Sequence, residues 1–212
     1  MKNRIAFVIF CLASTLGFQA GAQIIYLEPD AFTNGTVLDH VLPQVNLTTA
    51  GANNLPIPPV SFPVTATYDG FHFASTGTNV FGQAGVQFWN TNRRLRMDFN
   101  APVTALSIDF IGGDLFTNDI AELDVFNAAG TLVAAYISSP RAPGEVETLT
   151  VSRPLGDVAW AVAYAQPGDG NFIRLDNLRF TAVPEPGAAA LVVPALAMVL
   201  ALRQRVCWRA KR

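Results

Sequence analysis

Cysteine is almost absent from this chain of 212 residues. Its two cysteines, Cys11 and Cys207, lie near the ends, so the stretch 23–183 has none. This excludes a disulfide framework and a cysteine nucleophile for the central region. About 160 residues are nevertheless enough to bury a hydrophobic core without cross-links.

Charged residues are also scarce, at 14% of the chain. An average soluble protein has roughly 25%, so a disordered acidic or basic tail protein is excluded. The stretch 23–183 has no lysine, seven arginines and fifteen of the sixteen acidic residues, which gives a formal charge of −8. Because nucleic-acid phosphates need a basic surface, we expect no nucleic-acid partner.

The sequence lacks the common catalytic signatures. It has no Gly-x-Ser-x-Gly elbow, no His-Glu-x-x-His pair and no phosphate-binding glycine loop. The two histidines, His40 and His72, are expected to be structural or surface residues, because a catalytic histidine needs an orienting carboxylate and a substrate. We therefore predict that the protein is not an enzyme.

Residues 1–22 have the pattern of a secretory signal peptide. Lys2 and Arg4 precede an apolar run of about 13 residues, which is too short to cross roughly 30 Å of hydrocarbon. The small residues Ala20-Gly21-Ala22 then allow cleavage before Gln23. We expect signal peptidase to remove this segment and the following domain to be exported.

Residues 184–212 combine three different parts. Pro184-Glu185-Pro186 is an extended stop, because each proline fixes its own φ and disfavours helix in the residue before it. Residues 187–202 carry no charge and would span about 24 Å as a helix, and 203–212 hold five cations and no acid. The pattern predicts a single transmembrane helix with a cytoplasmic basic end. A buried core helix is the alternative, which the lack of a polar face disfavours.

Together these three parts resemble a PEP-CTERM sorting tail. The resemblance implies processing by an exosortase, a membrane-embedded protease-transpeptidase of Gram-negative bacteria that make exopolysaccharide. It implies that Pro184, Glu185 and Pro186 are the recognition motif and that Arg203 and Arg205 begin the retention cluster. The protein would cross the inner membrane, be anchored there transiently, and reach the cell surface or the extracellular matrix.

The central domain, residues 23–183, is predicted to be all-β. Alternation places Leu106, Ile108 and Phe110 on one face of the segment 103–110, and Leu123 and Val125 on the inner face of 121–126. Residues 127–130 turn this second strand into 131–137. Further strands are expected at 24–27, 45–48, 62–68, 86–89, 95–99, 146–151, 158–165 and 172–181. This spacing indicates an antiparallel β-sandwich.

The order of features in this domain resembles jelly-roll or galactose-binding-like domains. The resemblance rests on Phe81-Gly82, Trp89, the segment 97–103, and the closing segment 172–180 with its Asp176-Asn177-Leu178 centre. Sandwiches of that shape have many functions, so the fold alone does not identify one.

Two groups of acidic residues are candidate calcium ligands. Asp114 and Asp119 lie in a loop rich in the hard oxygen ligands that calcium prefers; the alternative is a solvated acidic loop. The resemblance to carbohydrate-binding jelly rolls implies a second site, formed by Asp176 of the closing strand with Glu28 and Asp30 near the start of the domain. The alternative is that Asp176 forms an ion pair with Arg174 or Arg179, or caps a turn.

Sugar recognition needs aromatic platforms beside planar polar groups. Trp89 is the better candidate because Asn90, Asn92, Arg93 and Arg94 follow it closely. Trp160 alternates with Val158 and Val162, which predicts a core position. The basic triple of Arg93, Arg94 and Arg96 either contacts an acidic polysaccharide or offsets nearby acids such as Asp98.

We therefore expect an exported, exosortase-sorted protein of the cell surface or the exopolysaccharide matrix, whose β-sandwich associates with carbohydrate. A purely structural coat protein is one alternative. A glycan hydrolase or lyase is another, and it would need two acids, or a histidine with an acid, in a groove.

Overall fold

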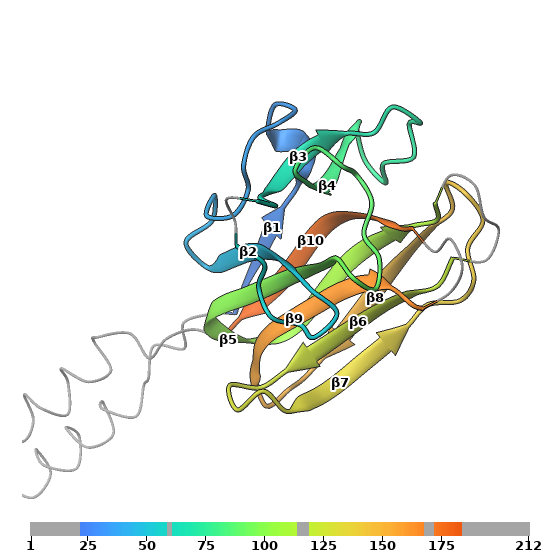
Figure 1. Cartoon of the computed structure of the whole chain (residues 1–212). Coiled ribbons are helices and arrows are strands. Elements are labelled where there is room, and N and C mark those ends of the chain that lie inside the picture. The colour runs from blue at the N-terminus through green and yellow to red at the C-terminus, as the bar shows by residue number, and fades with distance from the viewer. Residues whose placement is uncertain (1–21, 59–60, 114–118, 168–171, 184–212) are drawn as a thin grey trace, which may run out of the picture. The chain divides into compact units, whose positions relative to one another are not determined.

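The computed structural model describes residues 22–58, 61–113, 119–167 and 172–183 (Figure 1). The predicted signal peptide, apart from its last residue, and the predicted sorting tail lie outside these residues. In the described part of the chain, no helix is long and apolar enough to cross a membrane. Residues 23–183 form one compact unit, which is all-β and antiparallel.

Ten strands and one short 3-10 helix build this unit. The strands are β1 (Gln23–Leu27), β2 (Val45–Ala50), β3 (Val64–Tyr68), β4 (Asn79–Gln83), β5 (Arg94–Ile111), β6 (Ala121–Phe126), β7 (Leu132–Ile137), β8 (Val146–Ser152), β9 (Val158–Ala165) and β10 (Arg174–Ala182). The helix, η1 (Pro29–Ala31), follows β1 directly and has a proline at its first position, where no backbone donor is needed.

The strand β5 belongs to both layers of the sandwich. Its first half, up to Phe99, pairs with β2 and β9, and the layer continues through β6 to β7. Its second half, from Val103, pairs with β10 and β8, and Val103 also pairs with Val158 of β9. The register shifts between Asp98 and Val103, where Pro102 has no backbone donor to offer a neighbouring strand. β1 lies beside β10, with Gln23 opposite Ala182.

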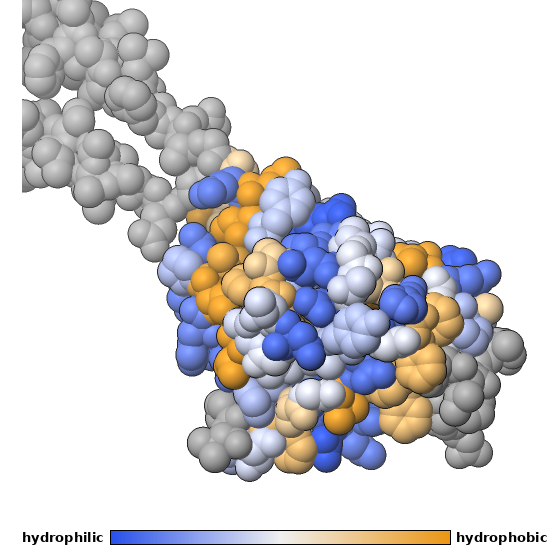
Figure 2. Space-filling view, turned by 90° about the horizontal axis from the view of Figure 1, so that it is seen from above, coloured by the Kyte–Doolittle hydropathy of each residue, from blue (hydrophilic) through white to orange (hydrophobic). Residues whose placement is uncertain are grey.

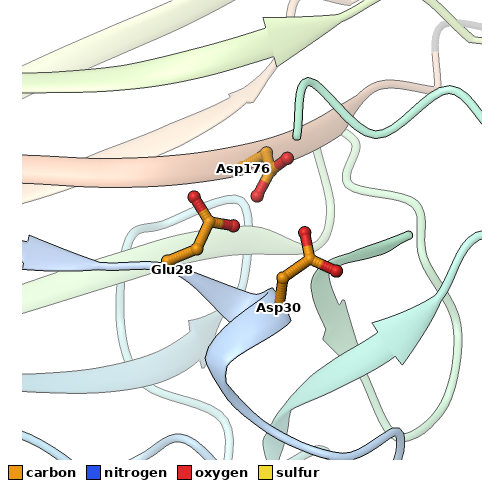
Figure 3. Close-up of side chains that lie close together, drawn as sticks. All are labelled: Glu28, Asp30 and Asp176. Atoms are coloured by element: carbon orange, nitrogen blue, oxygen red, sulfur yellow. The ribbon is translucent and has the colours of Figure 1, made fainter. Parts of the chain in front are cut away.

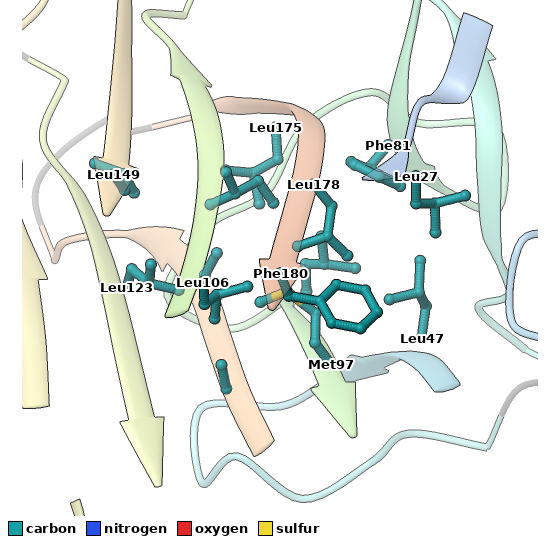
Figure 4. Close-up of a cluster of buried hydrophobic side chains, with 14 of the residues drawn as sticks. Leu27, Leu47, Phe81, Met97, Leu106, Leu123, Leu149, Leu175, Leu178 and Phe180 are labelled. Atoms are coloured by element: carbon teal, nitrogen blue, oxygen red, sulfur yellow. The ribbon is translucent and has the colours of Figure 1, made fainter. Parts of the chain in front are cut away.

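The core lies between the two layers (Figure 4). Leu106, Ile108 and Phe110 are at most 1% exposed, and Leu123 and Val125 are fully buried, which confirms the predicted inner faces. Burial of such side chains stabilises the fold by about 1.5–3 kcal/mol each, which is how a cysteine-free domain holds together.

Two expectations about the strands were wrong. The predicted strand 86–89 forms only single bridges, through Val86 and Trp89, because Ala84 and Gly85 reverse the chain with positive φ angles of 49° and 80°. The strand in that region is β4, and the two predicted strands 95–99 and 103–110 are the single strand β5.

Trp160 also differs from its predicted place in the main core. It is half-buried on the other face of β9, where its ring stacks on Phe126 at 3.8 Å. The Arg96 guanidinium lies over the same ring at 4.1 Å. Both faces of β9 are apolar, so alternation could not show which face looks inward.

Candidate functional site

A distortion of β10 sets the position of the closing-strand carboxylate. The register with β5 shifts between Asp176 and Arg179, and Asn177 has a left-handed φ of 56°. The backbone N–H of Asn177 donates to Asp176 Oδ1 at 2.9 Å, and its side-chain amide donates to Asp109 Oδ2 at 3.1 Å. Asparagine tolerates this backbone conformation better than most residues, which explains its presence at the bulge.

Three carboxylates converge at this bulge (Figure 3). Glu28 follows β1, Asp30 lies in η1, and Asp176 lies on β10. One oxygen atom from each side chain lies within 4.8 Å of the others, and the three side chains point toward one another. We call Glu28, Asp30 and Asp176 the carboxylate cluster.

Backbone N–H groups of the segment between β3 and β4 hold two of these carboxylates. Asp176 Oδ2 accepts from the N–H of Ser75 at 3.0 Å and of Thr76 at 3.2 Å. Asp30 Oδ1 accepts from the N–H of Thr78 at 2.7 Å and of Asn79 at 2.9 Å. These bonds fix the carboxylates without using all their oxygen atoms.

Two oxygen atoms of the cluster are buried and make no hydrogen bond: Glu28 Oε1 and Asp30 Oδ2. Burial and the nearby Glu28 carboxylate raise the pKa of Asp176 to about 7. The cluster therefore offers carboxylate oxygens that make no hydrogen bond, and a nearby cation would favour the ionised form of Asp176. Calcium is a hard divalent cation that prefers such oxygen ligands. The residues therefore fit the calcium site predicted around Asp176.

The alternative partners of Asp176 are engaged elsewhere. Arg174 forms a buried ion pair with Asp69, with 3.0 Å between Nε and Oδ1. Arg179 lies over the ring of Tyr26 at 5.8 Å.

The other predicted calcium ligands do not join the cluster. Asp114 lies outside the described residues. Asp119 is fully buried, and its Oδ2 accepts from the backbone N–H of Gly113 at 2.5 Å. The one group of three carboxylates found among the described residues does not include Asp119.

Trp89 is not available as a sugar platform, contrary to the expectation. It is fully buried, and its indole N–H donates to the Phe81 carbonyl at 2.7 Å. Its backbone pairs with Ile173, which turns the ring into the core.

Of the three arginines in the basic triple, Arg93 lines a surface depression. Arg94 is 9% exposed, lies over the Tyr164 ring at 3.8 Å and donates to Asn54, so it is not a glycan contact in this structure. Arg96 pairs with Asp98 at 2.6 Å, which is the charge-offsetting role considered above.

The depression has a volume of about 420 Å³. It is lined by Gln83, Val86, Phe88, Asn90, Asn92, Arg93 and Phe172. Two rings form its apolar wall: Phe88, and Phe172, which is 41% exposed and 6.0 Å from Phe88 between centroids. We call this feature the aromatic depression.

Hydrogen-bonding groups face the same space. The side-chain oxygen of Asn90, Oδ1, accepts from the backbone N–H groups of Asn92 and Arg93, which leaves its amide N–H₂ for a ligand. Arg93 lies over the Phe62 ring at 3.9 Å and donates to Gln83 through Nη1. The other N–H groups of this guanidinium make no hydrogen bond to the described residues. The depression thus combines rings with planar donors, the chemistry that sugar recognition needs.

Comparisons with known proteins identify no family. No family model and no curated protein matches the chain. Among solved structures, the chain is similar to the K2 cleaved adhesin domain of Lys-gingipain, with 18% identity, a TM-score of 0.49, and coverage of 75% of this chain and 99% of that one.

Two further solved structures are similar at a lower level. A xylan-binding domain from CBM 22 has 12% identity and a TM-score of 0.44, with coverage of 77% of this chain and 96% of that one. The xylan-binding module CBM15 has 10% identity and a TM-score of 0.41, with coverage of 78% and 99%. Similarity this distant does not transfer a ligand to this chain.

Sequence reasoning missed several residues of these sites. Ser75 and Thr76 lie about 100 positions from Asp176. Both donate through backbone N–H groups, which any residue type except proline supplies, and Ser75 adds a bond from its hydroxyl at 2.9 Å. No local motif around Phe88 or Phe172 indicated a ligand contact. The polar residues after Trp89 correctly indicated the loop, because Asn90, Asn92 and Arg93 line the depression. The aromatic residue in this loop that lines the depression is Phe88, not Trp89.

Proposed function

We propose that residues 23–183 form an exported, non-catalytic module that binds carbohydrate at the cell surface or in the exopolysaccharide matrix. The observation that carries this proposal is the aromatic depression, where two accessible rings stand beside amide and guanidinium donors. A sugar ring presents apolar C–H faces to rings and hydroxyl groups to planar donors, so this lining matches both of its surfaces.

We further propose that the carboxylate cluster binds calcium and that the bound ion stabilises the domain. Glu28, Asp30 and Asp176 would hold the ion, which would supply positive charge that offsets three converging carboxylates. The cluster also receives the backbone donors that precede β4, so the ion would stabilise this part of the sandwich.

A hydrolase or lyase is less well supported. No acidic residue belongs to the described lining of the depression, whereas glycoside hydrolysis uses two carboxyl groups flanking the bond. Glu122 and Asp124 are neighbours on β6, and burial raises the pKa of Asp124 to about 6. They lie instead on the outer face of their layer, where Asp124 accepts from the buried Tyr164 hydroxyl and Glu122 from Gln166.

The sorting of the protein is the second part of the proposal. Signal peptidase would remove residues 1–22, and an exosortase would recognise Pro184, Glu185 and Pro186 and process the tail. This part rests on the sequence pattern and its resemblance to PEP-CTERM tails.

A structural coat protein is the second candidate, and the edge strand β7 favours it. β7 ends its layer, contains no charge and no proline, and exposes Leu132 and Ile137 by 51% and 56%. Such an unblocked edge can pair with another copy.

Binding to the exopolysaccharide of the source organism tests the carbohydrate proposal. Protein purified from cells that express the full-length chain is run by native electrophoresis through gels with and without the polymer. Binding appears as retention, that is, slower migration in the gel that contains the polymer, and the polymer is checked for cleavage. We expect retention without cleavage, and about tenfold weaker retention in the double variant Asn92→Ala with Phe172→Ala. Leu155→Ala is the matched control, because Leu155 is 81% exposed and lies outside the depression.

Each other outcome selects another function. Cleavage of the polymer would replace the proposal with the hydrolase or lyase. No retention, together with self-association that Ala135→Lys on β7 abolishes, would replace it with the coat protein.

A further inference from the structure

The segment that follows β3 presents an exposed aromatic ring, Phe71. This ring is 51% exposed. The turn beneath it is closed by two bonds to Asp69: the N–H of His72 donates to the Asp69 carbonyl at 3.0 Å, and the N–H of Phe73 donates to Oδ2 at 2.7 Å. His72 adopts a φ of 60°, a conformation that is strained for a non-glycine residue. Figure 2 views this end of the domain from above and shows apolar side chains among hydrophilic ones.

A buried ion pair lies under this turn. Asp69 and Arg174 have no exposed surface, and Nε of Arg174 is 3.0 Å from Oδ1 of Asp69. Removing two charges from water is costly unless the pair is held in good geometry. The guanidinium also donates through Nη1 to the Gly112 carbonyl at 3.4 Å, so Arg174 is enclosed between Asp69, Gly112 and the rings that pack against it.

Three phenylalanine rings pack against the Arg174 guanidinium. Its Cζ atom lies 5.4 Å from the centroid of Phe71, 5.2 Å from that of Phe73 and 4.7 Å from that of Phe88. A cation within about 6 Å of a ring is attracted to it, and more strongly where water is excluded. Phe88 also lines the aromatic depression, so one guanidinium joins that depression to the exposed Phe71.

The other end of the same segment is held by the carboxylate cluster. Four N–H groups, those of Ser75, Thr76, Thr78 and Asn79, donate to Asp30 or Asp176. Phe71 is therefore exposed but held in place from both sides. An aromatic ring that is fixed before binding loses little conformational entropy when a ligand covers it.

We propose that Phe71 is a second aromatic contact of the carbohydrate site, so that the ligand is a polysaccharide chain rather than a single terminal sugar. This inference rests on the proposed function, since it extends the site from the depression across Phe88 to Phe71. Arg174 is the positioning residue: it does not touch the ligand but holds the rings of both contacts.

Fragments of increasing length test the inference. The exopolysaccharide of the source organism is partially hydrolysed and sorted by size, and binding of each fraction is measured by calorimetry with protein made from the full-length chain. Phe71→Ala should weaken binding of the long fragments by about tenfold and leave binding of the shortest unchanged. Phe172→Ala should weaken binding of all lengths, and Phe71→Tyr should retain long-fragment binding. Phe71→Ala removes one of the three rings over Arg174 and should lower the melting temperature, whereas Phe71→Tyr keeps the ring and should keep the melting temperature of the parent.

The outcomes separate the inference from the proposed function. Unchanged long-fragment binding in Phe71→Ala, with loss in Phe172→Ala, overturns the inference and leaves the depression as the whole site. Absence of binding at every length and to the intact polymer overturns the proposed function and the inference with it. A sedimentation coefficient that falls in Phe71→Ala assigns the ring to contact between copies and overturns the inference as well.

Discussion

Asp176 is the residue on which the chemistry of the carboxylate cluster depends. It is fully buried, it accepts backbone bonds from Ser75 and Thr76, and its pKa is raised to about 7 by burial and by Glu28. A carboxyl group whose pKa is higher in the folded than in the unfolded chain favours the folded state when protonated. Its contribution is complete below the unfolded value near 3.8 and is lost as the pH rises through about 7.

Calcium should reverse this dependence, because the ion binds the ionised carboxylates. We predict that saturating calcium raises the melting temperature by about 5–10 °C at pH 8 and by much less at pH 5. Thermal unfolding with calcium and with a chelator measures the effect at each pH. Asp176→Asn should abolish the response, and an equal response in that variant would show that the ion binds elsewhere.

At the scale of elements, the connection between β3 and β4 needs a glycine where it passes the cluster. Gly77 has a φ of +53°, and a Cβ atom there would lie 2.2 Å from the carboxylate of Asp30. Any side chain at this position must therefore displace Asp30 from the cluster.

We predict that Gly77→Ala removes the calcium response and lowers the free energy of unfolding by more than about 2 kcal/mol. Denaturant unfolding with and without calcium measures both effects. Gly130→Ala is the matched control: Gly130 also has a positive φ, +76°, but a Cβ atom there meets nothing within 4 Å. It should cost about 1 kcal/mol and keep the calcium response. Equal losses in the two variants would contradict a role for the close approach to Asp30.

The same elements show what sequence patterns predict and what they miss. Alternation predicted β6 and the inner face of β5, because each has one polar and one apolar face. It failed for Trp160, since β9 is apolar on both faces, and for β4, which contains Gly82 and lies between two turns. The pairing of Asp69 with Arg174 joins residues more than 100 positions apart, and no local pattern carries such a contact.

The candidate site was also predicted only in part. The resemblance to carbohydrate-binding jelly rolls placed Asp176 with Glu28 and Asp30, and the structure brings these three together. The sequence favoured Trp89 because Asn90, Asn92, Arg93 and Arg94 follow it closely. Its bridge to Ile173 buries it and leaves Phe88 and Phe172 at the surface of the depression.

At the scale of the whole molecule, the terminal segments are proposed to decide where the domain acts. Residues 184–212 carry the proposed sorting signal, with an uncharged stretch and five cations after it. We predict that deletion of 184–212 abolishes the membrane-bound precursor and releases the domain in soluble form from the exporting cell. Fractionation of cells and immunoblotting measure this.

Replacement of Pro184, Glu185 and Pro186 by alanine tests the recognition motif separately from the anchor. That replacement should keep the precursor in the membrane but prevent its processing. An unchanged membrane fraction after the deletion would contradict the proposed anchor.

The antiparallel pairing of β1 with β10 has a consequence for display. Gln23 lies opposite Ala182, so the chain enters and leaves the domain at the same end. The nine residues of β10 then run from Ala182 back to Arg174, which is roughly 27 Å at the rise of an extended strand. A module tethered through its carboxyl end would therefore use its own β10 as a spacer and hold its rings at the far end from the attachment point. Such a domain needs no stalk to reach a polymer beyond the surface that carries it.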